Sequence, residues 1–301
     1  MEPDPRARHR QVLRGGLRRG PPARSNPAAT SDAVYVLARL GENPSGPAWT
    51  VNGHSALDAL ADSADAYSKV DSGQAGKVAR AVAAAGGDPR SFGGADILGY
   101  IDAAYAPDTG RYNPDLLFRH TLALEGVVRS GEKATPQAID ALFAARLPDG
   151  GWFWAFKGKT SDVDTTGRVV ETLVEAGGLR CAPVLAPTLA YLAAKQTPQG
   201  WGVGNLPGAA NANSTALAVG ALRAAGYDAA AWRAGGDGPS ALESLLAFQE
   251  PSGAFLYTHE AGREESRLVA TLDALEALAE PVNQDVCGMV YLPVGPVTGG
   301  R

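Results

Sequence analysis

The 301-residue sequence contains only two cysteines, Cys181 and Cys287, too few to define a disulfide framework or a metal site. It also lacks an apolar run of roughly 18 residues, the minimum for a membrane-spanning helix. The basic N-terminus is not followed by the apolar stretch that a signal peptide requires. As written, the sequence predicts a cytoplasmic protein that does not cross a membrane. An extracellular or cell-surface location stays open if the true N-terminus lies upstream.

Negative charge prevails outside the first residues of the chain. The formal net charge is −5, but arginines gather in residues 1–24, so the remainder is more acidic than this figure. An acidic body argues against nucleic acid as a partner. Residues 1–28 are expected to be a disordered or misassigned leader, because no aromatic residue interleaves their arginines as it would in a nucleic-acid-binding arm. The excess of arginine over lysine is typical of a high-GC bacterial genome.

A helix that ends in glycine recurs along the chain at a nearly constant spacing. Glycine just after a helix is the favoured left-handed cap, so it marks the end of each unit. The terminal glycines are Gly41, Gly86, Gly131, Gly177 and Gly226. The helices of this inner type are predicted over 29–41, 72–86, 116–131, 163–177 and 212–226, with a copy without glycine over 265–280.

A second type of helix alternates with the first. Its copies are predicted over 55–67, 95–105, 136–147, 183–196 and 239–249. Two helix types in alternation form either a solenoid or a closed double ring. The inner helices are rich in alanine and other small residues, which favours a closed α/α toroid over 29–280. The ring would then lack one outer helix, expected within 1–28. Residues 281–301 are expected to form a non-helical tail, either a strap across the ring or a linker to a missing partner domain.

Three stretches carry a resemblance to a known family. They are PDGGWFWAFKGKTSDVDTTGRVVETLVEAG (148–177), PQGWG with NANSTALAVGAL (198–202 and 211–222), and PSGAF followed by 265–278. They resemble the repeat shared by squalene-hopene cyclases, protein prenyltransferase β subunits and cobalamin-binding intrinsic-factor proteins. The resemblance implies the α/α toroid of the prenyltransferase/terpenoid cyclase superfamily. Its relatives perform unrelated tasks, so it specifies the fold more closely than the function.

The resemblance to class II terpene cyclases implies a catalytic acid. Those enzymes protonate an alkene or an epoxide with the middle Asp of a DxDD motif at the start of an inner helix. Asp164 falls on the position of the acid and Asp162 on that of its partner, while Thr165 replaces the last Asp. The alternative is that these carboxylates only cap the helix and suit its dipole. Ser31/Asp32 and Asn213/Ser214 are expected to cap their own helices in the same way.

The other chemistries of the superfamily find no match in this sequence. Zinc-dependent prenyltransferases use Asp, Cys and His, but the matching positions hold Asp162, Asp164 and Arg267. No metal and no cofactor is therefore expected. The thioester of complement-like domains requires Cys-Gly-Glu-Gln, which the residues from Cys287 to Val290 do not provide.

Aromatic residues recur in the turns that precede the inner helices and could line a cavity that binds a substrate. Such rings can hold a polyprenyl chain, stabilise a carbocation or stack on a flat cofactor. For Trp152 and Trp201 the alternative is packing against a neighbouring helix end, and for His120 it is an ordinary satisfied histidine. The substrate-binding candidates are His120, Trp152, Phe153, Trp154, Phe156, Trp201 and Tyr257.

Two classes of function follow from these observations. The first is an isoprenoid-handling domain with an aromatic-lined cavity and class II cyclisation, in which Asp164 is the general acid and Asp162 tunes it. The second is a non-catalytic module that binds a hydrophobic molecule, a corrinoid or a protein. The altered DxDD motif and the length of a single toroid favour the second class, because class II cyclases commonly pair two toroids.

Overall fold

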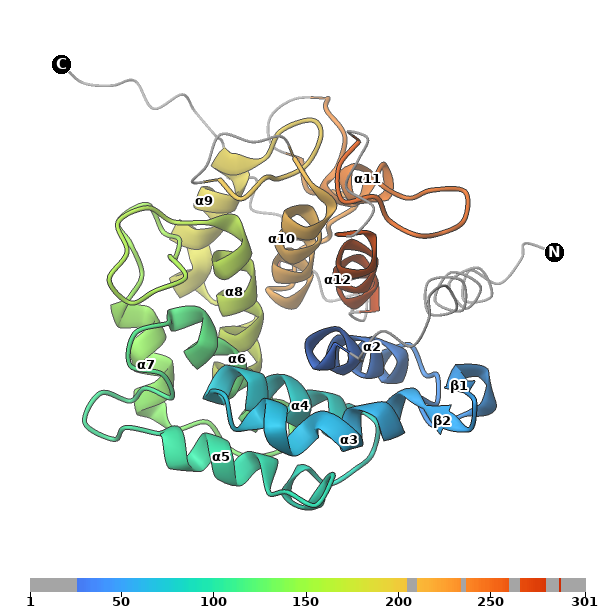
Figure 1. Ribbon diagram of the computed structural model, residues 1–301. Coiled ribbons are helices and arrows are strands. Elements are labelled where there is room, and N and C mark those ends of the chain that lie inside the picture. The colour runs from blue at the N-terminus through green and yellow to red at the C-terminus, as the bar shows by residue number, and fades with distance from the viewer. Residues whose placement is uncertain (1–25, 205–209, 234–236, 260–265, 280–286, 288–301) are drawn as a thin grey trace.

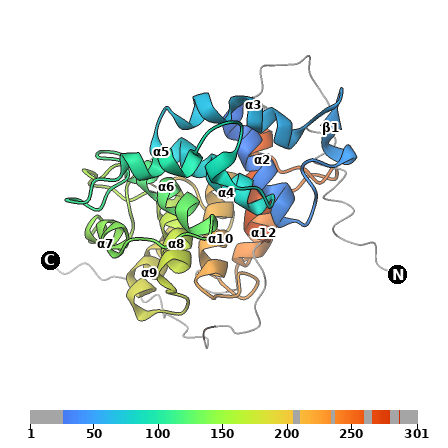
Figure 2. The same cartoon turned by 90° about the horizontal axis from the view of Figure 1, so that it is seen from below.

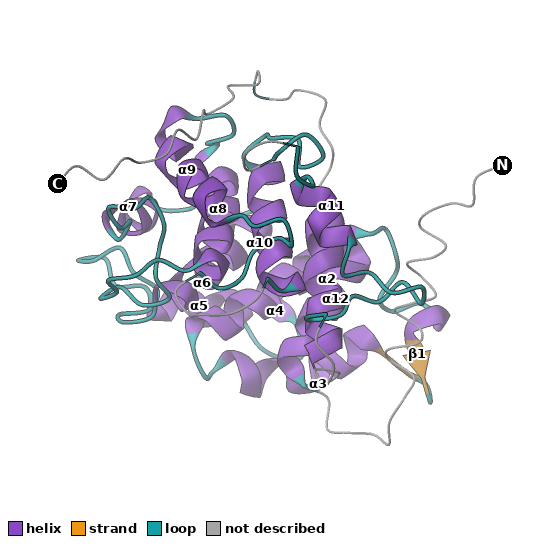
Figure 3. Cartoon of the chain, turned by 90° about the horizontal axis from the view of Figure 1, so that it is seen from above, coloured by secondary structure: helices purple, strands orange, loops and turns teal. Residues whose placement is uncertain are grey.

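The computed structural model describes residues 26–204, 210–233, 237–259, 266–279 and 287. These residues are mainly helical, as Figure 3 shows. The inner helices are α2 (Pro27–Arg39), α4 (Ser72–Ala84), α6 (Leu117–Arg129), α8 (Val163–Gly177), α10 (Ala212–Ala224) and α12 (Arg267–Ala279). Within the described residues, no helix is both long and apolar enough to cross a membrane.

Polar side chains start most of the inner helices, although not always at the expected residue. The capping side chains belong to Asn26, Asp71, Asp162 and Asn211, and each accepts a hydrogen bond from backbone N–H groups of the first turn. The expected caps Ser31/Asp32 and Asn213/Ser214 lie within helices, because α2 begins two residues earlier than predicted and α10 begins directly after its cap Asn211. Helix α6 has no side-chain cap at Leu116.

The predicted glycine residues at the ends of the inner helices are confirmed, except that the one after α8 is displaced by one residue. Gly41, Gly86, Gly131 and Gly226 all have positive φ values, as a left-handed helix end requires. At the end of α8 the left-handed residue is Gly178, with φ 62°, and Gly177 is the last helical residue.

The outer helices lie around the inner ones (Figure 1), and all but α3 are shorter than the inner helices. They are α3 (Ala56–Ser68), α5 (Ile97–Ala104), α7 (Pro136–Ala144), α9 (Ala186–Lys195) and α11 (Ala241–Leu246). Three short 3₁₀ turns, Pro47–Trp49, Pro89–Ser91 and Pro183–Leu185, begin at the prolines. A small hairpin, β1 (Thr50–Val51) with β2 (His54–Ser55), precedes α3.

The inner helices close into a ring. Each one packs against the next, and α12 packs against α2 to complete the circle, as Figures 1 and 2 show. Within the described residues, no outer helix comes before α2, which is the first helix, or after α12, which is the last. The missing outer helix was expected within residues 1–28, and residues 1–25 of this segment lie outside the described part of the chain. The expected tail over 281–301 is likewise described only at Cys287.

Candidate functional site

Asp162 acts as the cap of α8. Its Oδ1 accepts a hydrogen bond of 2.7 Å from the Thr165 N–H, and its own N–H donates to the Trp152 carbonyl at 2.8 Å. The carboxylate is 4% exposed. Burial raises its pKa, while hydrogen bonds from Thr165 and Trp154 oppose this effect. The hydrogen bond from Thr165 is a capping contact, and the bonds to Trp152 and Trp154 join the residue to the preceding turn.

Asp164 lies on the face of α8 that points into the ring, one turn before Arg168. Burial raises the pKa of its carboxyl to about 6, with a further contribution from Asp162 and an opposing hydrogen bond from Ser214. Its Oδ1 is buried and has no hydrogen-bond partner among the described residues. A raised pKa keeps the proton on Asp164 in mildly acidic solution but makes it a weaker acid, whereas protonating an alkene demands a strong one.

The aromatic turns are fastened to the inner helices by a repeated hydrogen bond. In each turn, the N–H of one aromatic residue donates to a side chain of the first helical turn. The pairs are Tyr112 with His120, Trp152 with Thr166, Trp201 with Thr215 and Phe255 with Thr271, at 2.9–3.1 Å. His120 therefore takes the place that threonine has in the later repeats. This equivalence could have been found by aligning the repeats.

Trp152 and Trp201 are fully buried. Their indole N–H groups donate to the carbonyls of Leu142 and Leu192, at 2.7 and 2.8 Å. Because each ring is enclosed against the end of an outer helix, neither is available to a ligand, and we do not include these tryptophans in the candidate binding site.

His120 is also fully buried and satisfied. Since its Nδ1 accepts from Tyr112, the hydrogen is on Nε2, which donates to the Ala138 carbonyl at 3.1 Å. Burial lowers its pKa to about 4, so the ring is neutral near pH 7. Phe156 packs beside it, with the Arg111 guanidinium 3.7 Å from the centre of the phenyl ring.

Trp154 is the exposed aromatic residue of this turn, and Phe153 beside it is partly buried. Trp154 is 50% exposed, and its ring packs against that of Phe153. Hydrogen bonds from the Phe118 N–H to the Trp154 carbonyl and from the Phe156 N–H to the Asp115 carbonyl hold the turn to the start of α6.

Trp154 forms part of a cavity of about 540 Å³ over the first turns of α2, α4 and α6. We call it the α2–α4–α6 cavity. Its lining residues are Ala28, Tyr67, Gln74, Lys77, Leu116, Phe118, Arg119, Leu122 and Trp154. Of the candidates from the sequence, this cavity contains Trp154 alone. Asp162, Asp164 and Tyr257 do not line it, and Tyr257 is partly buried against the core.

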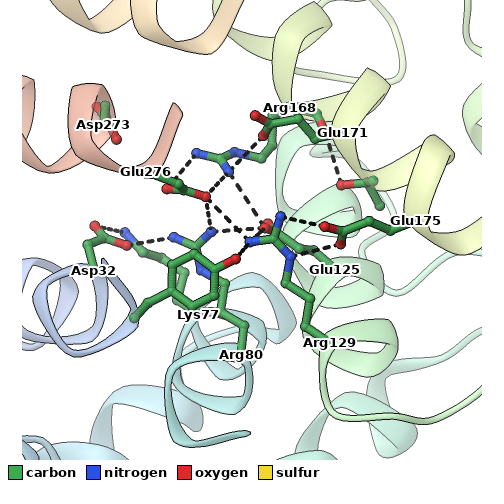
Figure 4. A network of polar contacts seen from close by, with 12 residues as sticks. Asp32, Lys77, Arg80, Glu125, Arg129, Arg168, Glu171, Glu175, Asp273 and Glu276 are labelled. Atoms are coloured by element: carbon green, nitrogen blue, oxygen red, sulfur yellow. Dashed lines mark hydrogen bonds and ion pairs between the residues drawn. The ribbon is translucent and has the colours of Figure 1, made fainter. Parts of the chain in front are cut away.

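The centre of the ring is filled by charged side chains that the sequence analysis did not single out (Figure 4). Glu276 lies among three guanidinium groups, 2.6 Å from Arg168, 3.0 Å from Arg80 and 3.4 Å from Arg129. Glu125 is fully buried and pairs with Arg80 and Arg129, at 2.9 and 2.8 Å. We call this set the central ion network. Its cations are Lys77, Arg80, Arg129 and Arg168, and its acids are Asp32, Glu125, Glu171, Glu175, Asp273 and Glu276.

The network follows the repeat. Four members occupy equivalent positions in four of the inner helices. Four others occupy the equivalent position three residues later, about one helical turn further along. The first group is Asp32, Lys77, Arg168 and Asp273, and the second is Arg80, Glu125, Glu171 and Glu276. Residues three apart on a helix share a face, so both groups point inward. A comparison of the inner helices column by column would have revealed these charges.

Protonation brings the network close to neutrality. It holds two more acids than cations, and burial raises the pKa of two of the acids, Glu171 and Asp273, the latter to about 7. Burial would also raise the pKa of Glu276, but Arg168, Arg80 and Arg129 hold it well below its usual range. The raised pKa values of Glu171 and Asp273 thus reduce the excess of negative charge in the network.

Asp273 should make the protein less stable as the pH rises. Burial raises the pKa of Asp273 from its usual value of 3.8 to about 7, so between these pH values the folded protein binds more protons than the unfolded chain does. Stability contributed by this group is present at pH 4 and is lost as the pH rises through 7. The side chain is partly exposed, so we expect a loss of about 2 kcal/mol between pH 4 and 8. Denaturant unfolding of Asp273→Asn should lack this loss, and a wild-type slope would contradict the assignment.

The structure provides no candidate metal centre. Within the described ranges, no group of three or more His, Cys, Asp or Glu side chains is placed to hold a metal ion. Arg267, at the third position of the zinc ligand pattern, donates to Glu250 at 3.0 Å.

Comparison with known proteins rests on structure, because no family model and no curated protein matches the sequence. The type II terpene cyclase MstE from Scytonema is 15% identical, with a TM-score of 0.58 over 91% of this chain and 96% of that one. Geranylgeranyltransferase-I of Candida albicans is 10% identical, with a TM-score of 0.57 over 92% and 91%. The fold is the α/α toroid of these proteins.

The same toroid occurs in proteins of other lengths and chemistries. This chain spans half of ent-copalyl diphosphate synthase from Streptomyces platensis, at 19% identity and a TM-score of 0.53. A polysaccharide lyase matches at 12% identity and a TM-score of 0.54. Likeness at this level establishes the toroid alone. The match to nearly the whole MstE chain also removes the argument that one toroid is too short for a cyclase.

Proposed function

We propose that this toroid binds an isoprenoid, or a similar hydrophobic molecule with a polar end, in the α2–α4–α6 cavity, and that it does so without cyclising it. The observation that carries the proposal is the composition of the cavity wall. Tyr67, Phe118 and Trp154 supply aromatic surface, and Leu116 and Leu122 supply aliphatic surface. A volume of about 540 Å³ is in the usual range for a small-molecule site.

The cavity also has a polar side, where the polar end group of such a ligand would lie. Lys77 and Arg119 line it, but Lys77 is paired with Asp32 at 2.6 Å and Arg119 with Asp71 at 3.6 Å. Because these carboxylates already offset the cations, apolar contact should dominate binding. A corrinoid is bulkier than the cavity can enclose, so we favour a flexible chain.

We expect no cyclisation because of the positions of the two candidate catalytic carboxylates. Neither Asp162 nor Asp164 lines the α2–α4–α6 cavity, and the charged side chains of the central ion network occupy the centre of the ring (Figure 4). A chain held in the cavity therefore has no carboxylic acid of this pair against it.

Truncating Trp154 tests the proposed site. Trp154→Ala should weaken binding of geranylgeranyl diphosphate or geranylgeraniol by about fivefold, because one aromatic contact contributes on the order of 1 kcal/mol. The side chain is half exposed, so the fold should be kept. Leu246→Ala, at an exposed position of α11, is the control and should bind as the wild type does. Titration calorimetry provides the measurement. Equal affinity of both variants, or tighter binding of cobalamin than of either isoprenoid, would refute the proposal.

Class II cyclisation by Asp164 is the second candidate, favoured by its inward position and its unpartnered Oδ1. Its test is incubation with squalene, geranylgeranyl diphosphate and shorter prenyl diphosphates, followed by product analysis. We expect no cyclised product. Any turnover that depends on Asp164 should increase as the pH falls below about 6, where this carboxyl holds its proton, and Asp164→Asn should abolish it. Such a result would replace the binding-only proposal.

A further inference from the structure

The two cysteines, which the sequence analysis left unassigned, form a disulfide. Cys181 lies in the loop between α8 and α9, and Cys287 follows α12, at a sequence separation of 106. The Cα atoms are 5.4 Å apart, within the range that an unforced bridge requires. Cys181 is exposed to solvent, so the bond is accessible to reductants.

The turn at the end of α10 is shaped to receive this bridge. The Cys181 N–H donates to the Ala225 carbonyl at 2.9 Å, and the Cys287 N–H donates to the Gly226 carbonyl at 3.1 Å. A Cβ at Gly226 would lie 2.5 Å from the Cys287 Sγ and 2.9 Å from the Cys181 Sγ. The cap glycine of this repeat thus provides the left-handed turn, with φ 96°, and also the space for both sulfur atoms. In the bridged structure, each cysteine thus also makes one backbone hydrogen bond to the turn after α10.

The bridge encloses the part of the chain that closes the ring. Helices α9 to α12 lie between the two cysteines, and α12 makes the closing contact with α2. Because α2 and α12 are the first and the last inner helices along the described chain, their contact joins the two ends of the ring. Tying the segment after α12 to the loop after α8 restricts the ways in which the seam can open.

We propose that Cys181–Cys287 is a redox-controlled clasp for the α12–α2 seam of the toroid, and that the protein folds in an oxidising compartment. Formation joins the two Sγ atoms. The two thiols lose two protons and two electrons, and a protein disulfide of the oxidising machinery accepts them and becomes a dithiol. A dithiol reductant reverses the exchange. Structural disulfides persist in secreted and extracytoplasmic proteins, so the bridge favours the extracellular or cell-surface location that the sequence left open. The inference is independent of the proposed ligand.

Hydrogen exchange of the oxidised and reduced full chain tests the clasp. In the oxidised protein, peptide mapping without reductant should find Cys181 linked to Cys287. After reduction, amides of α12 and α2 should exchange at least tenfold faster, while those of α4 and α6 should keep their rates. A loop of this length predicts a fall in Tm on the order of 10 °C. The double variant Cys181→Ser/Cys287→Ser should match the reduced protein and show no response to reductant.

Two outcomes would overturn the proposal. One is free thiols in protein produced in an oxidising compartment. The other is reduction that leaves exchange in α12 and α2 unchanged or accelerates exchange evenly in all inner helices. Reducing the folded wild type requires no substitution, so the test holds even if the double variant fails to fold.

Discussion

Replacing Glu276 with Gln should lower the free energy of unfolding by about 3 to 5 kcal/mol, because removing one partner leaves buried charges uncompensated. Glu276 is 5% exposed and contacts Arg80, Arg129 and Arg168. These arginines come from α4, α6 and α8, and Glu276 from α12. The substitution keeps the shape of the side chain, so the loss reports the charge. Urea unfolding at pH 7 provides the measurement.

A pair nearer the surface gives the matched control. Glu250 accepts from Arg267 at 3.0 Å, with side chains 23% and 38% exposed. Solvent screens such a pair, so Glu250→Gln should cost less than about 1 kcal/mol. If Glu276→Gln cost no more than this control, the central ion network would not hold the inner helices together.

The substitution Gly76→Ala should destabilise the protein by about 3 kcal/mol or more, because the added methyl group meets backbone. A Cβ at Gly76 would lie 2.0 Å from the Leu122 carbonyl oxygen, and one at Gly126 would lie 2.5 Å from the Gly76 Cα. Helices α4 and α6 thus touch at two glycines, and the methyl group can be accommodated only if the helices separate.

Gly238→Ala is the control for this prediction. A Cβ there would meet nothing within 4 Å, and the residue does not have a positive φ. Its Tm should stay within about 2 °C of the wild type, whereas that of Gly76→Ala should fall by on the order of 10 °C. Similar Tm values for the two variants would show that α4 and α6 do not approach as closely as described.

Local signals in the sequence predicted most of the fold. Capping residues and terminal glycines act within one or two turns of chain, so the order of inner and outer helices could be predicted from them. Helix starts were less certain, because several polar residues compete for the cap. Asn211 caps α10, while Asn213 and Ser214 lie inside it. Closure of the ring was predicted from the small residues of the inner helices, and the contact of α12 with α2 confirms this prediction.

The site was harder to predict, because its chemistry depends on distances between repeats. The alternative prediction that Asp162 caps its helix is confirmed, because its side chain caps α8. Trp152 stands beside Trp154 in the sequence, yet one is buried and the other is half exposed, which follows from the bond between the Trp152 indole and Leu142. The pairing of Cys181 with Cys287 depends on where two distant loops meet. Composition cannot show that.

The central ion network limits what the toroid can hold. Charged side chains from α2, α4, α6, α8 and α12 meet inside the ring (Figure 4), whereas the cavity is lined by residues at the first turns of α2, α4 and α6. A ring interior lined with aromatic residues, as the sequence suggested, would leave an apolar space beside Asp164. The cavity observed has Lys77 in its wall and Trp154 at its edge.

Photocrosslinking tests the location of the ligand most directly. A benzophenone analogue of geranylgeranyl diphosphate would be irradiated with the full chain, with and without excess unmodified ligand, and the labelled peptides identified by mass spectrometry. We predict saturable labelling of peptides that contain Tyr67, Phe118 or Trp154, and its loss in Trp154→Ala. Saturable labelling around Asp164 instead, or labelling that excess ligand does not suppress, would contradict the account.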